Sequence, residues 1–167
     1  MSIAEALIAD LEQEADGTRK MLALVPEAKF AWKPHEKSMT LGQLASHVAE
    51  APSWCAGFLE PVMDFAAMKD YRPFAASTNA ELRAAFDTNH KKAVAALRGR
   101  DDAFLRQTWT MKNGDTVLMT QVRKDAMRTI LVHHTIHHRG QLSVYLRLLG
   151  VPLPAIYGPT ADSPSFG

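Results

Sequence analysis

The sequence contains a single cysteine, Cys55, among its 167 residues. One thiol excludes a disulfide within the chain and any zinc site built from several cysteines. It also suits a reducing compartment, so we expect the protein to be cytoplasmic. If the chain binds a metal ion, histidine nitrogens or oxygen atoms must supply the ligands.

The chain also lacks a charge surplus and a long apolar run. Lysine and arginine number 19 against 18 acidic residues, so no basic excess predicts binding to nucleic acid. No stretch approaches the roughly 18 apolar residues of a membrane span. Residues 1–10 lack the basic start and apolar run of a signal peptide. We therefore expect a soluble protein that binds neither nucleic acid nor membranes.

Three helices are predicted from their first turns. Each follows a capping box, in which Ser or Thr precedes Glu or Gln by three residues. The boxes are Ser2 with Glu5, Thr40 with Gln43, and Thr78 with Glu81. The first helix is expected to end at Pro26 and the third at Gly99. The second should kink at Pro52 and end near Pro61, or continue in broken form to Met68.

A fourth helix, the longest, is predicted from about Met119 or Thr120 to Leu149. Before it, Asn113-Gly114 between short β-forming stretches predicts a hairpin with strands of three or four residues. Residues 151–167 are rich in Pro, Gly and Ser and should be irregular. With 47% hydrophobic residues, we expect one all-α domain over residues 1–167 that carries this hairpin.

The fourth predicted helix contains four of the seven histidines. His133 and His137 form one i, i+4 pair and His134 and His138 another, and such pairs project side by side from a helix. At about 100° per residue, His134 and His138 fall on the apolar stripe and the other pair lies outside it. The predicted stripe contains Met127, Ile130, Leu131, His134, His138, Gln141, Tyr145, Leu148 and Leu149.

A metal site needs a third ligand, and His47 is the candidate because it lies on the apolar stripe of the second helix. Packing that stripe against His134 and His138 would gather three imidazoles and leave a fourth tetrahedral position open. Plainer interpretations stay open: His47 as a hydrogen-bonded core histidine, and the helical pair as incidental. His35 and His90 lie in polar stretches and are assigned no role.

Two further residues are candidates for catalysis. Gln141 follows His138 by three residues on the same stripe, where its amide would orient a substrate or a ligand imidazole. Glu50 follows His47 by three residues and is the best candidate for a general base. Arg139 points away from the predicted metal face and is expected to form a structural ion pair or an interface contact. His133 and His137 are interpreted as surface groups or as support for the ligands.

These residues resemble the DinB family. The resemblance rests on three features: the motif His134-x-x-x-His138-Arg139-Gly140-Gln141, the sequence Leu-Arg-Leu-Leu-Gly-Val-Pro at residues 146–152, and His47 on an earlier helix ahead of a proline and Trp54. It implies a four-helix bundle with up-down-down-up connectivity, often a homodimer, and a divalent metal bound by His47, His134 and His138. The related proteins are grouped as metal-dependent hydrolases and as transferases that use a low-molecular-weight thiol such as bacillithiol or mycothiol.

The predicted function is therefore that of a divalent-metal enzyme. Three neutral imidazoles leave the ion its full positive charge, which favours deprotonation of a bound thiol or water. We expect a thiol S-transferase or a hydrolase acting on a small-molecule substrate. Zn²⁺ or Ni²⁺ is the expected metal, with Fe²⁺ and Mn²⁺ as alternatives, because imidazole suits all of them.

The alternative is a non-catalytic interaction or stress protein, in which the metal stabilises a dimeric bundle. Val132, Ile136 and Leu146 give the fourth helix a second apolar side, which would pack against a partner subunit. An exchangeable fourth position open to a pocket would favour the enzyme, and a sealed site the structural role.

Overall fold

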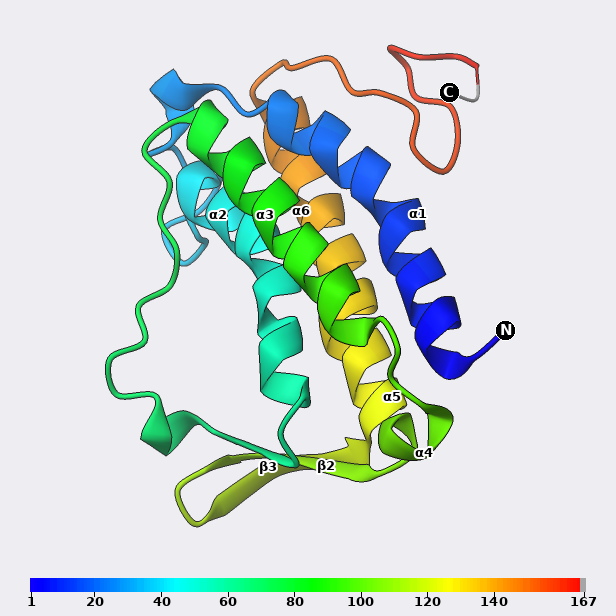
Figure 1. The fold of residues 1–167 in the computed structure, drawn as a ribbon. Helices are drawn as coiled ribbons and strands as arrows, with labels where there is room; N and C mark the ends of the chain where they lie inside the picture. Colours follow the sequence, from blue (N-terminus) through cyan, green and yellow to red (C-terminus); the bar gives the residue numbers. More distant parts are fainter. Residues whose placement is uncertain (166–167) are drawn as a thin grey trace.

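Four long helices pack side by side in the computed structural model, which describes residues 1–165 (Figure 1). They are α1 (Ile3–Ala23), α2 (Leu41–Glu50), α3 (Asn79–Leu97), and a last helix composed of α5 (Arg123–Met127), a π-helical segment (Arg128–His133) and α6 (His134–Leu148). Both α1 and α2 contact α3 and α6. In Figure 1, α1 and α6 run upward and α2 and α3 downward, as the resemblance predicted.

The three predicted capping boxes are all formed. In each, the Ser or Thr hydroxyl accepts a hydrogen bond from the backbone three residues on, and the Glu or Gln side chain accepts one from the cap residue's own backbone. Helix α3 stops before Gly99, whose φ of 75° suits glycine. The starts of these three helices are therefore encoded locally.

Helix α2 changes at Ala51 into a 3₁₀ helix that ends at Phe58. Pro52 lies in the first turn of this segment and has no N–H for the α-helical bond to the Val48 carbonyl. The predicted break at Pro52 is confirmed. This 3₁₀ helix ends near Pro61, as one alternative predicted. Strand β1 (Val62–Asp64) then separates it from a single 3₁₀ turn, Phe65–Ala67, so the helical structure beyond Pro61 is limited to that turn before Met68.

A sheet of three strands closes one end of the bundle, so the chain is not all-α. The strands are β1 (Val62–Asp64), β2 (Thr108–Asn113) and β3 (Thr116–Val122). The hairpin β2–β3 turns at Gly114 as predicted, but its strands have six and seven residues rather than three or four. Because β3 extends to Val122, the last helix begins at Arg123 and not at Met119 or Thr120. A short helix, α4 (Asp102–Leu105), also escaped prediction.

The long connection between α2 and α3 follows from their common direction. Two parallel neighbouring helices cannot be joined by a tight turn, so the chain must return along the length of the bundle. Residues 59–78 make this return (Figure 1). On the way, β1 pairs in parallel with β2, with Met63 opposite Met111. The connection therefore forms a wall beside the 3₁₀ segment that follows α2.

Met127 and Leu131 are buried as predicted, but beyond them the last helix buries a different face from the one that its sequence predicts. The buried residues of its central part are Leu131, Val132, Thr135, Arg139, Leu142 and Leu146. This stripe lies about a quarter turn from the predicted one, at 100° per residue. His134 and His138 are half-buried at its edge, on the side facing α2, whereas Gln141 and Leu148 are exposed.

The second apolar side assigned to a partner subunit belongs to the intramolecular core. Val132 is 6% exposed and Leu146 0%, and both belong to the clusters that fill the bundle. This observation removes the sequence argument for a partner at that face. Dimer formation itself stays a prediction.

Arg139 forms the structural ion pair that was expected of it. Its guanidinium, 4% exposed, contacts the Glu14 carboxylate at 2.6 Å and also donates to the Thr18 hydroxyl. Tyr157 donates to the same carboxylate from the C-terminal tail. The pair therefore fastens α6 and the tail to α1.

The tail is irregular from Val151 to residue 165, as predicted. Leu153 and Ile156 pack against the part of the core that contains Leu22, Leu142 and Leu146. The last two positions of the predicted tail, 166 and 167, lie outside the described residues. Across residues 1–165, no helix combines the length and the apolar character needed to cross a membrane.

We predict that Glu14→Gln lowers the free energy of unfolding by about 3–5 kcal/mol, because it leaves the Arg139 guanidinium buried without a counter-charge. Urea denaturation measures the change. Asp16→Asn is the matched control on the same helix, since the Asp16–Lys20 pair is exposed and should contribute about 0.5 kcal/mol or less. Equal effects of the two changes would contradict the structural role of the buried pair.

Candidate metal centre

Three imidazoles from two helices meet where α2 packs against α6. His47 lies in the last turn of α2, and His134 and His138 lie one turn apart at the start of α6. Each offers a nitrogen that lies within 4.8 Å of the others. The structure thus brings together the three residues predicted as ligands, although their binding of a metal stays a prediction.

The spacing of the nitrogens suits one metal ion. His134 Nε2 lies 3.4 Å from His47 Nε2 and 2.8 Å from His138 Nε2. In a tetrahedral site with metal–nitrogen bonds of about 2.0–2.1 Å, ligand nitrogens are about 3.3 Å apart. The observed separations lie within about half an ångström of that value. Small side-chain shifts would therefore accommodate the ion.

The contact with Gln141 concerns which nitrogen of the His138 imidazole carries the proton. Its Oε1 lies 2.7 Å from His138 Nδ1. With Oε1 as acceptor, Nδ1 must carry the proton, so the neutral His138 ring presents an Nε2 lone pair to the other two histidines. Gln141 therefore contacts a candidate ligand, and its predicted role in orienting that ligand or a substrate stays a prediction.

Burial keeps all three imidazoles neutral. It lowers the pKa of His47, of His138 and most strongly of His134, whose pKa falls to about 4; a positive charge on a neighbouring histidine would lower the pKa of His47 and His134 further. Neutral imidazole is the form that binds a metal. The donor set therefore fits a divalent cation.

Trp54 packs against two of the candidate ligands. Its ring centre lies 5.2 Å from that of His47 and 5.1 Å from that of His134. Within residues 1–165, His134 Nδ1 is buried and has no hydrogen-bond partner. Packing against Trp54, rather than a hydrogen bond to Nδ1, therefore supports that side of the His134 ring.

The three histidines lie between two cavities. One, of about 420 Å³, is bounded by His134 and Trp54 and extends toward the sheet. The other, of about 500 Å³, is bounded by His47 and Glu50 and extends along the length of α2. Small molecules therefore have space to reach the centre from two sides.

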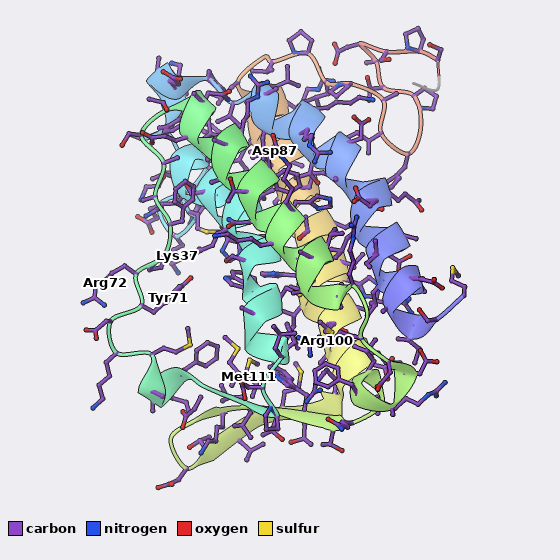
Figure 2. All side chains as sticks on the ribbon, viewed as in Figure 1. Lys37, Tyr71, Arg72, Asp87, Arg100 and Met111 are labelled. Atoms are coloured by element: carbon purple, nitrogen blue, oxygen red, sulfur yellow. The ribbon has the colours of Figure 1, made fainter. Side chains whose placement is uncertain are left out.

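Glu50 lies beside the centre but is bound to another residue. Its carboxylate, on a residue that is 7% exposed, accepts a hydrogen bond of 2.9 Å from the Tyr71 hydroxyl. Tyr71 borders the smaller cavity and Glu50 the larger one, so this hydrogen bond joins their walls. Figure 2 shows Tyr71 reaching inward from its loop while Arg72 points outward.

The sequence model of the DinB family matches residues 1–164. The chain belongs to the DinB family. It is 26% identical over 154 residues to the uncharacterized protein YrdA of Bacillus subtilis (strain 168), a match that covers 90% of this chain and 86% of YrdA.

Solved structures share the fold of this DinB chain. A DinB-like protein from Bacillus cereus ATCC 10987 is 23% identical, with a TM-score of 0.70 over 92% of this chain and 97% of its own. The DinB-like YjoA of Bacillus subtilis is 20% identical, with a TM-score of 0.65 over 87% and 92%. YfiT of Bacillus subtilis is 16% identical, with a TM-score of 0.65 over 88% and 87%, and is described as a probable metal-dependent hydrolase with an unusual four-helix bundle topology.

The remaining histidines of this DinB chain lie apart from the three, except for one contact. His133 and His137 are exposed, and the His137 ring meets His138 edge-on at 4.9 Å. His35 is exposed on the connection before α2. The placement of His90 in polar surroundings was wrong: it is 3% exposed, stacks on Phe86 and lies 3.1 Å from Glu12.

Sequence reasoning missed most of the smaller cavity in this DinB structure. Its wall includes Met63, Phe65, Met68 and Tyr71, which belong to the connection between α2 and α3. One signal was present, because three large apolar residues between positions 63 and 68 are unusual for a solvent-exposed loop. Their position beside the histidines depends on the pairing of β1 with β2.

Cys55 faces the core and not the centre. It is 1% exposed, and burial raises the pKa of its thiol to about 12. Within the described residues, the chain therefore has no thiol of its own to serve as a nucleophile. A thiol reaction at the three histidines requires an external thiol.

We predict that His134→Ala abolishes stoichiometric metal binding, because two imidazoles cannot replace three. Gln141→Ala should lower metal affinity about 10- to 100-fold by releasing the His138 ring. Elemental analysis and competition with a chromogenic chelator, on protein without a histidine tag, measure both effects. His133→Ala is the matched control, an exposed histidine one position away. Equal metal content in His134→Ala and His133→Ala would sink the ligand assignment.

We also predict that Cys55 resists alkylation in the folded protein. A rise in the thiol pKa from its ordinary value of 9.0 to about 12 lowers the thiolate fraction at pH 8 about a thousandfold, and the thiolate is the reactive form. Iodoacetamide labelling followed by mass spectrometry should modify the chain in 8 M urea and leave it unmodified under native conditions. Rapid native labelling at pH 8 would show that the thiol is accessible.

Proposed function

We propose that this DinB protein is a divalent-metal-dependent enzyme that transfers a low-molecular-weight thiol to a small electrophile. The convergence of three neutral imidazoles beside an open cavity carries the proposal. The description of YfiT as a probable metal-dependent hydrolase agrees with the metal requirement. Zn²⁺ or Ni²⁺ is the proposed ion, with Fe²⁺ and Mn²⁺ as alternatives, since each accepts imidazole ligands.

The ion would supply positive charge that favours the ionised form of a thiol or a water molecule bound beside it. The chain's own residues would hold the ion, fix the position of one imidazole proton and exclude water. His47, His134 and His138 would hold the ion, and Gln141 would keep the Nε2 of His138 free of its proton. Trp54 covers one side of His134, which would exclude bulk water there. The thiol proton would pass to solvent.

Transfer is the leading proposal because it needs no base positioned by the protein. In the reaction, the thiolate sulfur bonds to the electrophilic carbon as the bond from that carbon to the leaving group breaks, and the leaving group departs with the electron pair. Hydrolysis is the second candidate, since Glu50 borders the same larger cavity as His47 and a carboxylate is a suitable general base for water. Its hydrogen bond to Tyr71 occupies one of its oxygens.

A non-catalytic dimer stabilised by the metal is the third candidate function. The two cavities that meet the histidines weigh against it, because a purely structural metal site is usually closed by a fourth protein ligand. Homodimer formation is compatible with each of these proposals.

The metal requirement yields a direct test with 1-chloro-2,4-dinitrobenzene and a panel of thiols that includes bacillithiol and mycothiol. Chelation should reduce transfer about 100-fold or more, and Zn²⁺ or Ni²⁺ should restore it, because an unassisted thiol is mostly protonated at pH 7. His138→Ala should stay inactive after metal addition, while His133→Ala should behave as the unmodified protein. Transfer that survives chelation would remove the metal from the mechanism. Metal-dependent cleavage of 4-nitrophenyl acetate without thiol transfer would favour hydrolysis.

A further inference from the structure

The smaller cavity is enclosed by helices, sheet and connection together. Its volume is about 420 Å³, at the lower end of the roughly 300–1,000 Å³ typical of small-molecule sites. Met111 lies on β2 below the helices (Figure 2), and Tyr71 approaches from the loop before α3. The residues that line it are Trp54, Phe58, Met63, Phe65, Met68, Tyr71, Met111, Thr129, Ile130 and His134.

The lining offers no partner for an ionised ligand. Among the residues named above, none is acidic and none is lysine or arginine, and His134 is one of the three candidate metal ligands. The Tyr71 hydroxyl already donates to Glu50, which leaves the Trp54 indole N–H and the Thr129 hydroxyl as the other side-chain polar groups besides His134. A charged molecule that entered would lose its hydration without compensation. The cavity therefore selects against charge.

The shape and chemistry of the lining suit an aromatic ring. Trp54, Phe58 and Phe65 present aromatic surfaces, with which a ring stacks or meets edge-on. Three methionines come from separate segments: β1, the connection and β2. Methionine is flexible and polarisable and makes favourable contacts with aromatic rings. Such a wall adapts to rings with different substituents.

We propose that this cavity binds the second substrate, and that this substrate is a small, uncharged aromatic electrophile. The claim that the bound molecule is an electrophile rests on the proposed function. Its electrophilic carbon must lie at the His134 end of the cavity, where the ionised thiol would be. The binding of the ring rests on the cavity alone. The leaving group then departs from the carbon with its electron pair, as in the transfer described above.

Binding is tested without catalysis by calorimetric titration of the chelator-treated, metal-free protein at pH 7, so that no bound cation attracts an anion, with two probes of equal ring size. 2-Naphthol is neutral and naphthalene-2-sulfonate is anionic. We expect one naphthol per chain and at least about tenfold weaker binding of the sulfonate, because the cavity cannot compensate its charge. Equal affinities, or no saturable naphthol site, would overturn the proposal.

Variants then locate the probe. Met111→Asp places a carboxylate in the lining and should weaken naphthol binding at least about tenfold. Leu118→Asp is the matched control, since Leu118 lies in the same hairpin and is 52% exposed. Met68→Glu, in the loop outside helices and strands, repeats the test if Met111→Asp does not fold. Unchanged binding in a folded variant of either lining residue would place the probe elsewhere.

One further variant separates this proposal from the proposed function. His138→Ala should lose the metal and keep naphthol binding within about twofold, because His138 is not part of the lining.

An activity measurement then tests whether the ring bound in the cavity is the ring that reacts. The neutral electrophile 1-chloro-2,4-dinitrobenzene should react at least about tenfold faster than anionic 4-chloro-3,5-dinitrobenzoate. Naphthol binding without metal-dependent transfer would reject the function and retain the cavity. Transfer that does not distinguish the two electrophiles would reject the assignment of the cavity to the substrate.

Discussion

The common direction of α2 and α3 is the constraint on which much of this structure depends. Neighbouring parallel helices require a returning connection, and residues 59–78 supply it. That connection supplies β1, which completes the sheet, and it supplies one wall of the smaller cavity. The bundle topology and the space beside the histidines therefore have a single origin in chain connectivity.

The three histidines occupy the boundary between core and cavity. In the buried stripe of α6, the charged residue is Arg139, which is paired with Glu14 on α1. At the edge facing α2, His134 and His138 are only half-buried, and this partial burial is enough to lower their pKa values. Complete burial would isolate the imidazoles from substrate, and full exposure would leave them protonated more readily. The observed depth permits both neutrality and access.

Much of the fold was predictable because its signals are local. Capping boxes, Pro52 and Gly99 act within one turn of their own positions, and each had its expected effect. The parallel pairing of β1 with β2 joins residues almost fifty positions apart, and no local pattern specifies it. The three histidines were predicted as a group from helical spacing and from the family resemblance. The cavity next to them was not, because it depends on that distant pairing.

The π-helical segment at Arg128–His133 explains part of the shifted face of the last helix, and it has a consequence for sequence change. A π-turn accommodates one extra residue within an otherwise α-helical run. Loss of a single residue there would allow the segment to rewind as α-helix without turning the helix beyond it, because the π-turn had absorbed that residue. His134 and His138 would then stay on the side facing α2, whereas loss of one residue between them, within α6, would turn one away from the other by about 100°. A change of one residue in chain length is therefore compatible with the site in the π-helical segment and incompatible with it between the two histidines.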